Sequence, residues 1–65
     1  MKYARIKRMS DGMWLGRGTD VREEWVKSRS GARLFNKMNE SFKCWTMRLA
    51  RENPEETYEI KESEI

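Results

Sequence analysis

The chain lacks histidine altogether and has one cysteine (Cys44) and one proline among its 65 residues. A single cysteine cannot form an internal disulfide, and no His/Cys cluster is available to bind zinc, so we expect neither a metal nor a cofactor. Catalysis requires a proton-transfer group, an activated nucleophile or a metal. Cys44 would need a partner that stabilises its thiolate, yet the adjacent Lys43 points about 100° away if both lie on a helix. The composition therefore predicts a protein that is not an enzyme.

Long apolar runs are also absent. Nothing approaches the roughly 18 apolar residues of a membrane span, and residues 1–8 are too charged for a signal peptide. A lone thiol suits a reducing compartment, so we expect a cytoplasmic protein without membrane contact. A chain of this size buries only about 60% of its unfolded surface, which indicates one small domain spanning residues 1–65.

Charge is distributed unevenly along the sequence. Residues 1–51 hold thirteen Lys/Arg and five Asp/Glu, whereas residues 52–65 hold one Lys and six Glu. The basic body has two candidate partners, which are external phosphate groups and the acidic end of its own chain.

The hydrophobic pattern predicts strands at both ends of the chain. Alternation over residues 3–9 puts Arg5 and Lys7 on a wet face, and Ser10-Asp11-Gly12 predicts a turn into a second strand over residues 13–16. Alternation also predicts a strand over residues 56–61 with an acidic outer row. Because opposite charges on neighbouring strands attract, we expect the first and last strands to lie side by side.

Between these strands the pattern is less regular. A third strand is expected at about residues 24–27, centred on Trp25, although the spacing of Val21 and Trp25 also suits a short helix. Residues 62–65 are expected to fray.

One helix is predicted over residues 37–52. Met38, Phe42, Trp45 and Leu49 fall within a stripe about 60° wide, which is typical of a face that packs on a sheet. Asn53-Pro54 ends it, because a residue before proline resists helical dihedral angles. The expected fold class is therefore α+β, with a small antiparallel sheet of three to four strands packed on this helix.

The opposite side of the predicted helix carries the main candidate site. Met47 projects there among Lys43, Cys44 and Arg51, and methionine is adaptable at binding surfaces. An incidental exposed methionine is the plain alternative. Trp14 would serve as a further anchor if it pointed away from the helix, and would otherwise belong to the core. The loop cations Arg17 and Arg29 complete the partner-binding set.

Several segments carry a resemblance to known proteins: Tyr3 to Lys7, Trp14-Leu15-Gly16, Trp25-Val26, Ala32 to Phe35, the helix with Glu40 and Trp45, and Tyr58 to Ile60. In this order they resemble a recurrent type of very small bacteriophage protein. The resemblance implies an accessory product of host-takeover or anti-defence type, which acts in the bacterial cytoplasm as an inhibitor by protein–protein interaction with a host or defence-system protein. It supplies no catalytic residue, because the type has no shared site.

A second resemblance covers Ala4 to Trp45. Its element order is similar to that of the arm-site-binding domains of phage-type tyrosine integrases, in which three strands precede a helix and the sheet enters the DNA major groove. It implies DNA binding by a basic three-stranded sheet as the alternative function, although Glu23 and Glu24 depart from that pattern. A virion-assembly subunit is a third interpretation, and a homo-oligomer stays open in each case. The nucleic-acid-binding residues would be Arg5, Lys7, Arg8, Arg17 and Arg33.

Overall fold

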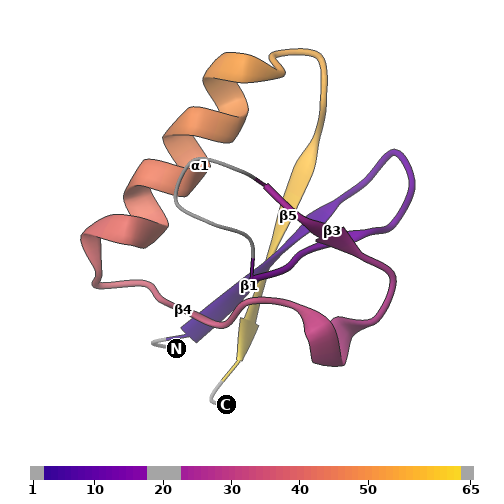
Figure 1. Ribbon diagram of the computed structural model, residues 1–65. Coiled ribbons are helices and arrows are strands. Elements are labelled where there is room, and N and C mark those ends of the chain that lie inside the picture. The colour runs from indigo at the N-terminus through magenta and orange to yellow at the C-terminus, as the bar shows by residue number, and fades with distance from the viewer. Residues whose placement is uncertain (1–2, 18–22, 64–65) are drawn as a thin grey trace.

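The computed structural model describes residues 3–17 and 23–63 (Figure 1). It confirms the α+β fold, with one helix packed against a curled antiparallel sheet. The elements in chain order are β1 (Tyr3–Arg8), β2 (Trp14–Leu15), β3 (Trp25–Val26), the 3-10 helix η1 (Arg29–Gly31), β4 (Phe35–Asn36), α1 (Glu40–Glu52) and β5 (Tyr58–Ser63).

Strand β1 is the centre of the sheet. Strand β5 pairs with it along its full length, from Tyr3 opposite Ser63 to Arg8 opposite Tyr58. Strands β2 and β4 pair with opposite ends of β1, and β3 adds to the outer side of β2. A strand has two hydrogen-bonding edges, so β2 and β4 must share the edge that β5 leaves. The expected adjacency of the first and last strands is confirmed.

Side-chain alternation along β1 separates the two faces of the sheet. Ala4 and Ile6 are both 0% exposed, and Ile6 packs in the core cluster with the helix residues Trp45 and Leu49. The residues of β1 that alternate with Ala4 and Ile6 point to the opposite face of the sheet, and so do the residues paired with them on neighbouring strands. We call this the back face. The back face consists of Tyr3, Arg5, Lys7, Trp14, Val26, Asn36, Glu59 and Lys61.

The helix starts later than the sequence pattern predicted. Asn39 is the N-cap, and its side chain accepts a hydrogen bond from the Ser41 N–H at 3.2 Å, so α1 begins at Glu40 rather than at residue 37. Met38 precedes the cap and is 83% exposed, which makes its assignment to the core stripe wrong. Helical periodicity has no meaning before the cap. The rest of the stripe faces the core as predicted, namely Phe42, Trp45 and Leu49.

The strands also differ in extent from the prediction. Strands β2 and β3 are two residues each, and Trp25 lies in β3 rather than in a helix. Strand β4 was not predicted. Strand β5 continues through Ser63, so Glu62 and Ser63 belong to the sheet and not to a frayed end. The last two residues of that expected end, 64–65, lie outside the described ranges.

The contrast between Leu49 and Met38 is testable by truncation. Leu49 is 1% exposed, so Leu49→Ala should lower the free energy of unfolding by about 2–5 kcal/mol through lost burial and a cavity. That is a large part of the roughly 3–10 kcal/mol expected for a chain of this length. Met38→Ala should change it by less than about 0.5 kcal/mol. Urea titration followed by Trp fluorescence measures both, and equal losses would contradict the assignment of the core.

Candidate functional site

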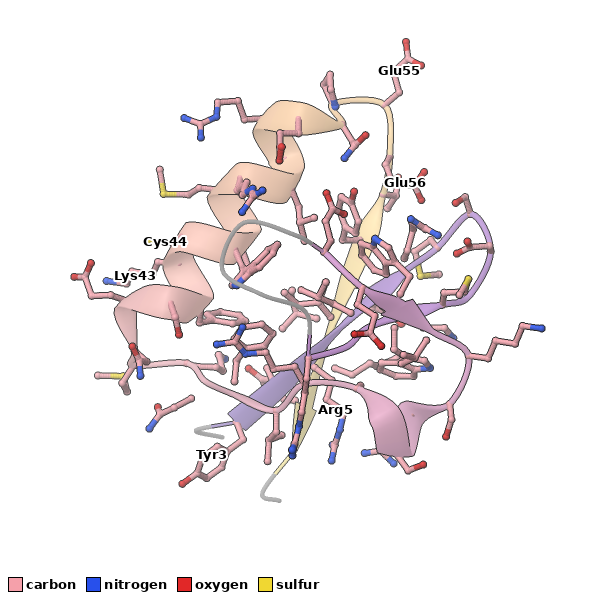
Figure 2. The ribbon with its side chains drawn as sticks, viewed as in Figure 1. Tyr3, Arg5, Lys43, Cys44, Glu55 and Glu56 are labelled. Carbon is pink, nitrogen blue, oxygen red and sulfur yellow. The ribbon has the colours of Figure 1, made fainter. Side chains whose placement is uncertain are left out.

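Four of the residues predicted to bind a partner lie together on α1. Lys43, Cys44, Met47 and Arg51 are all exposed, and Met47 keeps 70% of its surface accessible. Spacings of three, four and eight residues place them on one side of a helix, and Figure 2 shows Lys43 and Cys44 on the outer side of α1. We call these four residues the outer helix face.

A shallow pocket of about 250 Å³ borders this face. Its lining includes Cys44 and the edge of Trp45, whose ring is otherwise buried in the core. The Arg48 guanidinium lies 4.9 Å from the centre of the Trp45 ring, and its Nε donates to Glu52 at 2.9 Å. The pocket lining thus includes an aromatic ring and a cation that Glu52 holds in place. Sequence reasoning missed Ser41 and Arg48, although their spacing of three or four residues from Cys44 and Trp45 could have identified them.

The outer helix face is positively charged. Neither Lys43 nor Arg51 forms an ion pair with any residue that the structure describes. The acidic Glu55 and Glu56 lie beyond the C-terminal end of α1, where Figure 2 shows them well separated from Lys43. The two cations can attract an acidic surface of a partner. Met47, which lies between them, can then bury an apolar part of that surface.

The structure removes Trp14 from the set of anchors. Trp14 pairs with Lys7 on the back face, so it does point away from the helix, yet it is only 8% exposed. The Lys7 Nζ lies over its ring at 5.5 Å, and Val26 stands opposite it in β3. The loop cations Arg17 and Arg29 are exposed, but they follow β2 and β3 and are not part of α1.

Arg8, a member of the alternative nucleic-acid-binding set, is engaged by the exposed Asp11. Its guanidinium donates to both Asp11 carboxylate oxygens, at 3.1 and 2.5 Å, and lies 4.3 Å from the centre of the Trp25 ring. Trp25 in turn stacks on Tyr58 at 5.9 Å and donates to Glu23 at 2.8 Å. Arg8 therefore packs against the Trp25 and Tyr58 rings, which border the core cluster. Arg33, another member of that set, lies over the Phe35 ring at 4.8 Å.

Arg8, Asp11, Glu23 and Tyr58 also border a polar hollow of about 400 Å³. The hydrogen bond from Arg8 lowers the pKa of Asp11, while burial first and then the nearby Glu23 carboxylate raise the pKa of the Tyr58 hydroxyl. Within the described ranges, no group of three or more His, Cys, Asp or Glu side chains is arranged to hold a metal ion. The hollow is lined by Arg8, Ser10, Asp11, Glu23, Asn53, Glu56 and Tyr58.

No protein family, curated protein or solved structure matches the chain. Across the segments that the structure describes, no helix has the length and apolar character needed to cross a bilayer. The function must therefore be argued from the surfaces themselves.

Three ion pairs predict acid sensitivity of the fold. The pKa of Asp11, of Glu59 and of Glu62 is lowered, in each case mainly by a hydrogen bond from its cation: Arg8, Lys61 and Lys37, respectively. A lowered pKa in the folded state means that the unfolded chain binds more protons in acid. This stabilisation is complete above about pH 5 and is lost as pH falls through the ordinary carboxyl range near 4 and below.

We therefore expect the melting temperature, followed by circular dichroism, to fall as the pH drops from about 5 to about 3. Asp11→Asn should have a lower melting temperature than the native chain near pH 7 and a smaller drop in acid, because its share of the effect is already gone. A melting temperature that stays constant over this range would contradict the assignment.

Proposed function

We propose that this chain is a non-enzymatic, phage-encoded binding protein that inhibits or modulates a host protein by covering its surface. The observation that carries the proposal is the exposure of Met47 between two cations, next to a pocket floored by Trp45. The phage origin and the host or defence-system target rest on the resemblance of the segment order and not on the geometry.

The outer helix face has the properties of an interface centre. Interfaces are enriched in Met, Arg and aromatic residues, and a few central side chains carry most of the binding free energy. Met47 supplies flexible apolar area, and a side chain of the partner can enter the pocket beside Cys44. A protrusion and a neighbouring hollow of this kind allow interdigitation with the partner.

The helix is also preorganised for binding. Trp45 and Leu49 hold α1 against β1 from within, and Asn39 fixes its start. A face already ordered in the free protein loses little conformational entropy on association. The positive charge at Lys43 and Arg51 favours a partner that carries acidic groups around a small apolar surface. The chain would bind this partner in the bacterial cytoplasm.

A negative charge introduced at the centre of this face tests the proposal. Partner capture from bacterial lysate by the native chain should identify a protein whose affinity can then be measured by calorimetry. Met47→Glu should weaken that binding by about 2 kcal/mol, roughly 30-fold, because it places a carboxylate in the desolvated centre. Met38→Glu is the matched control, because it changes an even more exposed methionine (83% against 70%) outside α1. Equal binding by the native chain and the Met47 variant would refute the proposal.

The thiol gives an independent probe of the same face. Cys44 is exposed and lines the pocket, so a bulky maleimide should react with the native chain and abolish partner binding. The purified partner should in turn slow the reaction, as measured by mass spectrometry. Undiminished binding by the fully labelled protein would show that the interface lies elsewhere.

A further inference from the structure

The back face of the sheet contains an unfavourable pair of like charges. Arg5 stands directly opposite Lys61 in the register of β1 and β5. Side chains in such positions have Cβ atoms about 4.5–5.5 Å apart, and like charges there destabilise a sheet. The prediction of a basic row facing an acidic row holds for Lys7, which lies opposite Glu59, but fails for Arg5.

The one carboxylate in the back-face set is already engaged. Glu59 accepts a hydrogen bond from Lys61 at 2.9 Å, and Lys7 contributes to lowering its pKa. Lys7 also lies over the Trp14 ring. Glu59 thus interacts with both lysines and leaves Arg5 without a counter-ion among the described residues of this face.

Arg5 is also left with an unsatisfied donor. Its Nε is shielded from solvent and has no acceptor among the residues that the structure describes. A buried donor without an acceptor costs free energy, and a charged donor costs more than a neutral one. The like-charge pair and the unpaired Nε both cost the fold free energy, and an anion bound at the accessible part of the partly exposed Arg5 side chain would offset part of that cost.

The geometry suits an oxyanion bound by a guanidinium. Arginine presents a planar fork of donors that matches phosphate, and an anion between Arg5 and Lys61 would turn their repulsion into two attractions. Helix α1 packs on the other face of the sheet. In Figure 2 Arg5 and Tyr3 lie in the lower part of the view, away from Lys43 and Cys44 on α1.

We propose that Arg5 and Lys61 form a phosphate-binding site on the back face. Arg5 and Lys7 are two residues apart and point to the same side of β1, and the partly exposed Tyr3 continues this row. Cations in line with an aromatic ring are the arrangement by which proteins hold single-stranded nucleic acid, so an oligonucleotide is the favoured carrier of the phosphate and a free anion is the second source. The site does not depend on the outer helix face.

Fluorescence anisotropy with a labelled single-stranded oligonucleotide at low salt tests this site. Arg5→Gln should weaken binding about tenfold and reduce the slope of log K against log salt by about 0.7, the value for one lost phosphate contact. Lys61→Gln should weaken binding in the same direction. Lys43→Gln removes one positive charge from the outer helix face instead. Measured at about 0.1 M salt, where the Debye length is about 10 Å, its affinity should stay within about twofold of native.

A second experiment with inorganic phosphate distinguishes a free anion from an oligonucleotide as the source of the phosphate group. If it raises the melting temperature of the native chain but not of Arg5→Gln, and the oligonucleotide does not bind, the phosphate is a free anion. Without phosphate, Arg5→Gln should melt no lower than the native chain, because it removes the like-charge pair. If Arg5→Gln fails to fold, the exposed Lys61→Gln decides by oligonucleotide binding and by the shift that phosphate causes in its own melting temperature, because this variant also loses the ion pair with Glu59.

The proposal fails if neither probe binds the native chain. It fails equally if Lys43→Gln weakens oligonucleotide binding as much as Arg5→Gln does, because the binding would then follow net charge and not a site. Partner capture by Arg5→Gln keeps this test separate from the proposed function, since that variant leaves the outer helix face intact.

Discussion

The pairing of β1 with β5 is the constraint on which the rest of the structure depends. It joins the two ends of the chain, occupies one whole edge of β1, and leaves the other edge to β2 and β4. Its register places Ile6 in the core and Arg5 on the back face. A slip of one residue between the strands would put Glu59 and Lys61 on the core side and turn the half-buried Tyr58 away from it, so the hydrophobic pattern favours the observed register.

This register also decides which cations are left for a partner. The acidic end does not neutralise the basic body uniformly, because Glu59 is engaged by Lys61 and lies opposite Lys7, while Glu62 pairs with Lys37. Among the residues that the structure describes, positive charge without a paired carboxylate includes two surfaces that lie on opposite sides of the sheet. One is the outer helix face, where it lies beside an exposed methionine, and the other is the back face, where the Arg5 Nε has no acceptor. These two surfaces are the basis of the two binding proposals.

The sequence predicted those features that depend on local periodicity. The first and last strands, their adjacency and the exposed position of Met47 follow from alternation or from helical spacing. Met38 was misassigned because the start of the helix depends on the Asn39 cap, which the apolar pattern does not record. Strand β4 and the burial of Trp14 depend on long-range pairing. The pairing of Arg5 with Lys61 could be found only once the register of β5 was fixed, because a general match of basic and acidic rows does not say which residues face each other.

The register of β1 and β5 can be measured directly by NMR in the free protein. In the observed register, cross-strand nuclear Overhauser effects between like backbone protons, Hα with Hα or HN with HN, connect Arg5 with Lys61 and Lys7 with Glu59. Like-proton effects that connect Arg5 with Ile60 or with Glu62 instead would place the strands one residue out of this register. It would contradict the assignment of the core, the burial of Ile6 and the charge arrangement of the back face together.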